Sequence, residues 1–330
     1  MDSRERVNAA MVFQKPDRVP LQYHPSPRGY YEYGEKMREL FRKYPYDFDE
    51  DVLDQPVPVP PAYAFNEKGE YHELKRDEWG VLWEYRIFGI QGHPLERPLD
   101  DFSALGNYRM PPNRTVEKKN TDKYLLKGWG SLLEKLIALR NYEDVLMDLQ
   151  TDSPEINRLA DMLVEHQLRD IDNLLAAGVD SVQFGDDFGT QYDLILSPAV
   201  FRRFFKPRFG TMIDKVKKAG KKVHFHSCGA NDKILEDLKD LGIDSYWPQL
   251  TAYDTADLAR RLKEYKIACA LHFRGDIMNH GTPEDVTRWV NETSALFDVQ
   301  NGSAWFYIEI DDGFPYENTV ALFEAVDKNR

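Results

Sequence analysis

Residues 181–185 (SVQFG) and 222–226 (KVHFH) read as two short apolar strands, and a helical pattern over residues 197–219 lies between them. Gly220 follows the helical pattern, as glycine does at many helix C-termini. A strand, a long crossover helix and a second strand are typical of a parallel βαβ unit, because parallel neighbours need a long connection. Helices cover the sheet in such units, so this stretch predicts an α/β fold.

The same cycle continues on both sides of this stretch. Upstream, the pattern predicts a strand at 124–126 and a helix over 154–177 that ends at Gly178. Downstream it predicts the following elements: helix 233–241, strand 244–247, helix 255–265, strand 267–273, helix 283–297, strand 304–310 and helix 316–327. A closed barrel and an open doubly wound sheet both fit this alternation. No Gly-x-Gly-x-x-Gly follows a strand, and 330 residues suit a barrel with insertions. We therefore expect a (β/α)8 TIM barrel.

The first third of the chain is irregular. Prolines at 16, 20, 25 and 27 and the run over 55–61 interrupt any long helix or strand. Residues 77–85 are rich in aromatic side chains and predict a short strand or hairpin. We expect an elaborated N-terminal region within one barrel domain that spans residues 1–330.

Composition excludes several classes of partner. A net charge of −13 argues against nucleic acid, which would require a basic stripe. No stretch approaches the ~18 apolar residues of a membrane span, and no apolar run follows the charged N-terminus as it would in a signal peptide. Only two cysteines are present, Cys228 and Cys269, which suits a reducing compartment. We expect a cytoplasmic enzyme or binding protein.

Polar side chains gather where the predicted strands end. In a parallel barrel the active site lies at the C-terminal ends of the strands. The candidates at these ends are His24, Asp186, Asp187, His226, Cys228, His272, Glu309 and Asp311.

His226 and Cys228 are a candidate pair of zinc ligands. Alternate residues of a strand share a face, so His224, His226 and Cys228 point the same way. Imidazole and thiolate ligands favour zinc over magnesium or calcium. The alternative is a buried histidine and a small buried thiol inside the barrel, and His224 fits that description best. The position just before Gly229, where backbone can approach a ligand, favours a functional role.

A catalytic zinc needs a third protein ligand and an open position. Cys269 lies inside a predicted strand between two alanines, so core packing is expected of it. Glu309 reaches the correct end of the last strand and is the preferred third ligand. Asp311, His272 and Asp187 remain alternatives.

Two carboxylates at a strand end, Asp186 and Asp187, cannot both be buried and ionised without partners. Either one caps the next helix while the other is solvated, or one holds a substrate group or a metal-bound histidine. We expect Asp187 and His272 to be catalytic, by positioning the substrate or moving a proton. The residues expected to bind substrate are His24, Arg28, Asp186, Gln191 and Tyr192.

Several motifs together resemble uroporphyrinogen decarboxylase-like proteins along essentially the whole chain. These motifs are residues 2–10 (DSRERVNAA), 15–20 (KPDRVP), 185–191 (GDDFGTQ), Ser197-Pro198, Lys206-Pro207, 226–229 (HSCG) and 314–318 (FPYEN). The resemblance implies a (β/α)8 barrel. Decarboxylases of this family grip the carboxylates of a tetrapyrrole with an arginine-rich N-terminal motif. The corresponding stretch here, residues 26–31, retains only Arg28.

The other branch of the family consists of corrinoid-dependent methyltransferases, several of which hold zinc with His-x-Cys and a distant cysteine near the last strand. His226-x-Cys228 matches the first part, while residues 305–314 contain Glu309 and Asp311 and no cysteine. The resemblance implies a zinc-assisted methyltransferase that exchanges a methyl group between a corrinoid protein and a small thiol or a methoxylated or methylated substrate. A separate protein would carry the methylcobalamin, because this chain contains no Asp-x-His-x-x-Gly pattern. Tetrapyrrole decarboxylation and a non-catalytic ligand-binding barrel are the alternatives.

Overall fold

The computed structural model describes residues 1–50, 52–273 and 275–330, and the chain divides into two compact units. The first unit consists of Met1–Pro60, Asn120–Leu126 and Asp244–Arg330. The second consists of Pro61–Lys119 and Lys127–Ile243. The single-domain organisation expected for residues 1–330 stays a prediction.

Four parallel strands form the sheet of the first unit, in the order β1-β10-β9-β8. Their bounds are β1 Leu21–Tyr23, β8 Ser245–Pro248, β9 Ala268–His272 and β10 Ala304–Ile308. Leu21 pairs with Phe306, and Ala304 pairs with Cys269. All five residues of β9 and all five of β10 are buried, as expected for strands with both faces covered.

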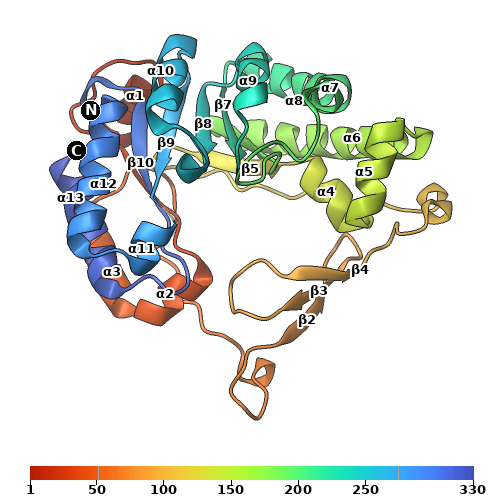
Figure 1. The fold of residues 1–330 in the computed structure, drawn as a ribbon, viewed down its shortest axis with the longest axis horizontal. Helices are drawn as coiled ribbons and strands as arrows, with labels where there is room; N and C mark the ends of the chain where they lie inside the picture. Colours follow the sequence, from red (N-terminus) through yellow and green to blue (C-terminus); the bar gives the residue numbers. More distant parts are fainter. Residues whose placement is uncertain (51, 274) are drawn as a thin grey trace. The chain divides into compact units, whose positions relative to one another are not determined.

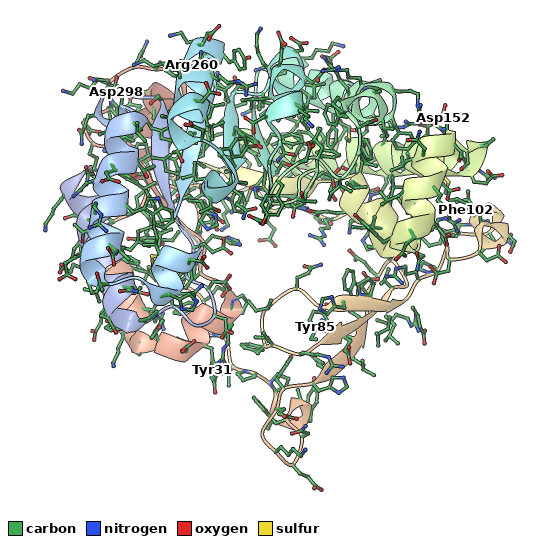
Figure 2. The ribbon with its side chains drawn as sticks, in the orientation of Figure 1. Tyr31, Tyr85, Phe102, Asp152, Arg260 and Asp298 are labelled. Carbon is green, nitrogen blue, oxygen red and sulfur yellow. The ribbon has the colours of Figure 1, made fainter. Side chains whose placement is uncertain are left out.

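The helices of the first unit come from both ends of the chain. They are α1 Ser3–Met11, α2 Pro27–Tyr33, α3 Glu35–Lys43, α10 Thr255–Tyr265, α11 Asp276–His280, α12 Pro283–Leu296 and α13 Tyr316–Lys328. Figure 1 shows α12 and α13 side by side, and α10 also packs on α12. The outward side of α10 is charged: Arg260, labelled in Figure 2, pairs with Asp257 at 2.5 Å and with Glu264 at 3.3 Å.

An apolar cluster forms the core of the first unit. Its members are Val7, Met11, Phe48, Tyr124, Leu126, Ala268, Ala270, Trp305 and Tyr307, with Trp247 packed against it. Ala268 and Ala270 lie two residues apart on β9, so their side chains point to the same face. Because both are small, they leave room for Trp305 and Tyr307 from the next strand. Cys269, between the two alanines, is fully buried, as the sequence predicts.

A buried ionic cluster centred on Asp47 also belongs to the first unit. The Asp47 side chain is fully buried, and its carboxylate accepts hydrogen bonds from the guanidinium groups of Arg6 (2.6 Å) and Arg18 (3.0 Å). The backbone N–H of Leu21 donates to the same carboxylate at 3.0 Å, and Arg330 lies 3.5 Å away. One buried carboxylate therefore joins α1, β1 and the C-terminal residue.

Three neighbouring strands of the parallel sheet lie in the second unit, in the order β7-β6-β5. They are β5 Leu126–Gly130, which starts at the boundary residue of the first unit, β6 Ser181–Gly185 and β7 Lys222–Ser227. β6 and β7 pair in parallel, with Gly185 opposite His226. A separate antiparallel sheet, β2-β3-β4, contains Glu73–Arg76, Leu82–Tyr85 and His93–Glu96. The short strand or hairpin expected over residues 77–85 is confirmed by β3, which pairs with β2.

The helices of the second unit surround β6 and β7 in sequence. They are α4 Leu133–Leu139, α5 Tyr142–Thr151, α6 Pro154–Ala177, α7 Pro198–Val200, α8 Lys206–Lys218 and α9 Leu235–Asp240. α6 matches the sequence prediction at both ends. Ser153 caps its N-terminus by accepting the N–H of Ile156, and Gly178 ends it at φ 83°.

The helix predicted over 197–219 is interrupted. Residues Phe201–Phe205 form a π-helical turn between α7 and α8. Pro207 has no backbone N–H and crowds the carbonyl four residues earlier, which gives a physical reason for the widened turn. Phe188, just after β6, packs edge-on against Phe201, Phe205 and Phe209. This aromatic contact fixes the loop that follows β6.

The α/β class with parallel strands is confirmed, but the described residues do not show a closed eight-stranded barrel. The described residues form seven parallel strands. Between β1 and β5, the described strands are β2, β3 and β4, which pair only with one another in antiparallel fashion. A single parallel bridge, Phe48 to Tyr124, stands where a further strand could have formed. Prolines 56, 58, 60 and 61 remove the N–H donors that a strand after this bridge would need.

No helix in the part of the chain that the structure describes is both long enough and apolar enough to span a bilayer.

Candidate metal centre

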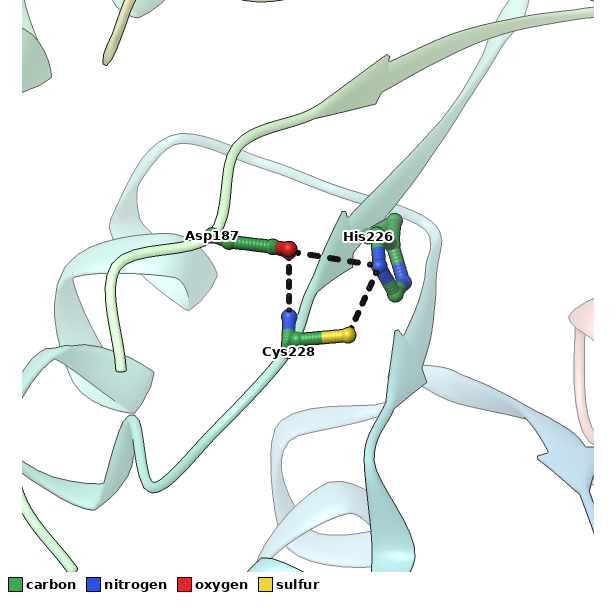
Figure 3. A group of neighbouring side chains, drawn as sticks. All are labelled: Asp187, His226 and Cys228. Atoms are coloured by element: carbon green, nitrogen blue, oxygen red, sulfur yellow. Dashed lines mark hydrogen bonds and ion pairs between the residues drawn. The ribbon is translucent and has the colours of Figure 1, made fainter. Parts of the chain in front are cut away.

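Three donor side chains meet at the ends of β6 and β7 in the second unit. His226 lies within β7, Cys228 follows the last residue of that strand, and Asp187 lies two residues beyond β6. His226 Nε2 lies 3.4 Å from Cys228 Sγ and 3.4 Å from Asp187 Oδ1, as Figure 3 shows. The three donor atoms all lie within 4.8 Å of one another. In the described residues this is the one group of three or more such donors.

The loops after β6 and β7 hold this group in place through backbone contacts. The N–H of Asp186 donates to the carbonyl of His226 (3.1 Å), and the N–H of Cys228 donates to Asp187 Oδ1 (2.8 Å). The loops cross at Gly189 and Gly229. A Cβ on Gly229, whose φ is +78°, would lie 2.2 Å from the backbone of Gly189. Glycine is therefore required at this crossing, which explains why the residue that follows Cys228 is a glycine.

A buried asparagine, Asn231, holds the loop that follows β7. Asn231 is fully buried, and its amide nitrogen donates to the carbonyls of Cys228 and Gly229 at 2.9 Å each. These bonds fix the backbone at Cys228 and at the residue that follows it. The donor group is thus preorganised by the main chain of two adjacent strand ends.

Burial and mutual contact shift the pKa values of the donors. Burial lowers the pKa of His226, but the contacts with Asp187 and Cys228 outweigh it and raise this pKa to about 10. Burial raises the pKa of Asp187, while the contacts with His226 and with the N–H of Cys228 lower it, and the net shift is downward. The fully buried ring of His224, one pleat away, has a pKa lowered to about 3, by burial and by the charge of His226. His224 is therefore neutral, and its burial agrees with the buried neighbour that the sequence predicts.

The residues fit a zinc ion. A tetrahedral zinc places its N, O and S ligands about 2.0–2.3 Å from the metal, so pairs of ligand atoms lie about 3.4–3.6 Å apart. The two separations at His226 Nε2 are both 3.4 Å. A nitrogen, a sulfur and an oxygen donor are a set that zinc accepts. His226 is buried, and the Asp187 side chain is 46% exposed, so the open side of the group is reachable from solvent.

The carboxylate of Asp186 accepts hydrogen bonds from backbone N–H groups of the second unit. Its Oδ2 accepts the N–H groups of Leu132 (2.7 Å) and Leu133 (2.8 Å), and its Oδ1 accepts that of Glu134 (2.8 Å). The side chain is fully buried, and burial raises its pKa well above the usual range. Asp186 therefore caps the start of α4, a helix that precedes it in the sequence. Its expected contact with substrate stays a prediction.

His272 and Glu309 form a second polar cluster, in the first unit. The indole N–H of Trp247 donates to His272 Nδ1 at 3.0 Å, and His272 Nε2 lies 3.0 Å from Glu309 Oε2. Because an indole nitrogen can only donate, Nδ1 is the acceptor and Nε2 carries the proton of the neutral ring. Glu309 and the alternatives Asp311 and His272 thus belong to the first unit, whereas His226 and Cys228 belong to the second. The role of Glu309 as third ligand stays a prediction.

The remaining predicted substrate-binding residues differ in exposure. His24 follows β1, is exposed, and lies 4.0 Å from Glu50. Arg28, in α2, donates to Asp312 Oδ1 at 2.6 Å. Gln191 and Tyr192 lie in the loop after β6, and Tyr192 is 93% exposed. Their contacts with substrate stay predictions.

Three residues near these clusters were not expected from the sequence: Trp129, Glu134 and Trp247. Trp129 packs beside His226, Glu134 accepts its indole N–H, and Trp247 orients His272. The expected strand at 124–126 stopped short of Trp129, and helix α4 was not anticipated. For Trp247, the one available signal was its own position: it is the last residue of the strand predicted at 244–247, and functional residues gather at strand ends.

The protonated His226 predicts how zinc affinity depends on pH. Zinc binds neutral imidazole, so at pH 7–9 binding must displace a proton from a ring whose pKa is about 10. We expect the apparent zinc affinity to rise about tenfold per pH unit over this range for each proton released. Competition with a chromophoric chelator at several pH values measures the slope. A His224→Gln variant is the control and should keep the slope, since His224 is already neutral there. A flat profile in the wild type would contradict the prediction.

The fold and the donor group define an α/β protein of parallel strands with a candidate metal site at the ends of two neighbouring strands. A family model described as uroporphyrinogen decarboxylase (URO-D) matches residues 130–328, which contain the whole donor group. The chain belongs to the uroporphyrinogen decarboxylase family. No curated protein was found to match the chain.

Similar solved structures were found as well. A methyltransferase from Methanosarcina mazei is 14% identical, with a TM-score of 0.64 and 99% of each chain covered. This likeness shows a shared fold. A Gloeophyllum trabeum endo-β-1,4-xylanase is 10% identical, with a TM-score of 0.42 over 62% of this chain and 76% of that one. A Xanthomonas albilineans dihydropteroate synthase is 10% identical, with a TM-score of 0.40 over 60% and 66%.

Proposed function

We propose that this protein is a zinc-assisted methyltransferase that exchanges a methyl group between a corrinoid protein and a small thiol or a methoxylated or methylated substrate. The observation that carries the proposal is the Asp187–His226–Cys228 group, with donor types and spacings that suit zinc. Membership of the uroporphyrinogen decarboxylase family supports an enzyme. The fold shared with the Methanosarcina mazei methyltransferase supports this kind of activity.

His226 and Cys228 would hold the metal, and Asp187 is the third donor that lies beside them. Glu309, Asp311 and His272 are the alternative third ligands. Zinc bound here would lower the pKa of a thiol or hydroxyl group, or polarise the oxygen of a methyl donor. Three protein donors would leave one position of a tetrahedral site open for the substrate.

The chain's own carboxylates and histidines supply the proton chemistry of the proposal. Asp187 is half exposed, so where Glu309, Asp311 or His272 is the third ligand, the Asp187 carboxylate can accept a proton from a thiol or hydroxyl group at the metal site. His272 Nε2 lies 3.0 Å from Glu309 Oε2, which places a second proton donor and acceptor close together in the first unit. The methylcobalamin would be carried by a separate corrinoid protein.

Tetrapyrrole decarboxylation has weaker support. A substrate with many carboxylates needs cationic side chains to grip it. Arg28, the arginine retained in the N-terminal motif, is bound to Asp312 and also lies 4.0 Å from Glu32. Two carboxylates of the chain already neutralise it.

The proposal is tested by metal content and by methyl transfer in parallel. Protein purified without added zinc is expected to contain about one zinc per chain. Incubation with methylcobalamin and a panel of small thiols should demethylate the cobalamin, which changes its visible absorbance. A chelator should abolish the reaction and added zinc should restore it. Protein that stays metal-free and inactive after zinc addition would contradict the proposal, and carbon dioxide release from uroporphyrinogen would favour the decarboxylase.

A further inference from the structure

Trp129 is a large aromatic side chain that stays half exposed beside the donor group. It is the fourth residue of β5, and it is 42% exposed. Its ring centroid lies 5.6 Å from that of His226, with 39° between the ring planes. Exposure of an indole costs free energy that burial against a neighbour would recover. The exposed part of the Trp129 indole therefore lies beside a metal donor, where a bound ligand can pack against it.

A carboxylate fixes the outer edge of this indole. The indole N–H of Trp129 donates to Glu134 Oε2 at 3.0 Å. Glu134 lies in the first turn of α4, and its own backbone N–H donates to Asp186 Oδ1. Asp186 immediately precedes the donor Asp187. The segment that places Asp187 thus also fixes the helix that orients Trp129.

A glycine makes room for the inner edge of the indole. A Cβ on Gly185, the last residue of β6, would lie 2.6 Å from both Cη2 and Cζ2 of Trp129. Backbone and ring are in direct contact at this point. The six-membered ring lies against the end of β6 because residue 185 has no side chain. Together with Glu134 and His226, this gives three restraints on one partly exposed side chain.

We propose that Trp129 is a substrate-positioning residue of the metal site. Its exposed face packs against the apolar, methyl-bearing part of the substrate, while the substrate's reacting atom takes the open side of the donor group. Aromatic faces bind methyl and methylene groups through burial and dispersion, and they carry no charge that would compete with the donors. This inference rests on the proposed function, and it names the residue that selects the apolar part of the substrate.

Steady-state kinetics separates positioning from general damage. Trp129→Ala should raise KM for the small thiol used in the methylcobalamin assay about three- to tenfold. It should leave kcat and zinc content nearly unchanged, as expected when binding common to ground and transition state is lost. Trp129→Phe keeps an aromatic face and should restore most of the affinity. Gly185→Ala would displace the Trp129 ring and should also raise KM. The matched control is Trp83→Phe. Trp83 lies in β3 of the separate antiparallel sheet of the same unit, and its indole N–H donates to Asp77 and not to a residue of the donor group.

A second readout needs no methyl transfer. Co²⁺ bound in place of zinc quenches the fluorescence of an adjacent indole, and Trp129 is the tryptophan paired with His226. Co²⁺ should quench the part of the emission that comes from Trp129, one of six tryptophans, in the wild type and in Trp83→Phe, and this part of the quenching should be lost in Trp129→Phe. Quenching that is unchanged in Trp129→Phe, or a KM unchanged in a folded Trp129→Ala variant, would overturn the inference. Wild-type protein that binds no Co²⁺ would overturn the metal site itself, and this inference with it.

Discussion

Replacing Cys228 with alanine is expected to remove the bound zinc and, with it, methyl transfer. The thiolate is one of the donors in a preorganised group, so its loss leaves His226 and Asp187 as the local protein ligands. Loss of a group that merely supports a metal ligand costs about 10–100-fold in metal affinity. Loss of a ligand should therefore cost at least about 100-fold, and activity should fall at least as far. Zinc analysis after dialysis and the methylcobalamin assay measure both effects.

The second cysteine provides a matched control. Cys269 lies in β9, is fully buried, and belongs to the core of the first unit. A Cys269→Ala variant loses one thiol and a small core contact, and it should retain about one zinc per chain. Equal zinc loss in the two variants, or full zinc retention in Cys228→Ala, would sink the assignment of Cys228 as a ligand.

Replacing Asp47 with alanine is expected to lower the free energy of unfolding by about 3–5 kcal/mol. Asp47 is fully buried, and the variant would leave the buried guanidinium groups of Arg6 and Arg330 without this carboxylate. The N–H of Leu21 would also lose its acceptor at the start of β1. The cost arises mainly from the buried charge of Arg330, whose remaining carboxylate partner, Asp327, lies 4.0 Å away, whereas Arg6 keeps Asp17. Urea unfolding followed by circular dichroism measures the change.

Asp17 is the control for this prediction. It also contacts Arg6, at 2.6 Å, but its side chain is 43% exposed, so water can replace the lost partner. We expect Asp17→Ala to cost about 1 kcal/mol or less. If Asp47→Ala cost no more than Asp17→Ala, the buried cluster would not be a major source of stability.

Local patterns predicted most of the parallel elements. Helix α6, bounded by Ser153 and Gly178, and the strands β6 and β7 follow from capping residues and apolar runs that act within a few positions. It could not be predicted in this way that the described residues form seven parallel strands and not the closed barrel that was expected. Whether the segment after Phe48 becomes a strand depends on pairing with distant residues and on the prolines that follow. The π-helical turn before Pro207 depends equally on packing around Phe188.

The donor group was predictable in part. His226 and Cys228 were found because a strand's two-residue period places them on one face. Asp187 was only one of several candidates, since its approach to Cys228 depends on the crossing of Gly189 and Gly229. Trp129 gave no signal, because its position depends on Glu134 and on the bare Cα of Gly185. Contacts between elements of this kind leave no short-range pattern in the sequence.

All three donors lie between residues 187 and 228, within one compact unit. Any ligand that binds only the folded form adds its binding free energy to the stability of the part that holds it. A metal held by Asp187, His226 and Cys228 would therefore slow local opening of β6, β7 and the loops that follow them. The occupancy of the centre would set the resistance of this unit to hydrogen exchange and proteolysis, which links metal supply to the lifetime of the protein.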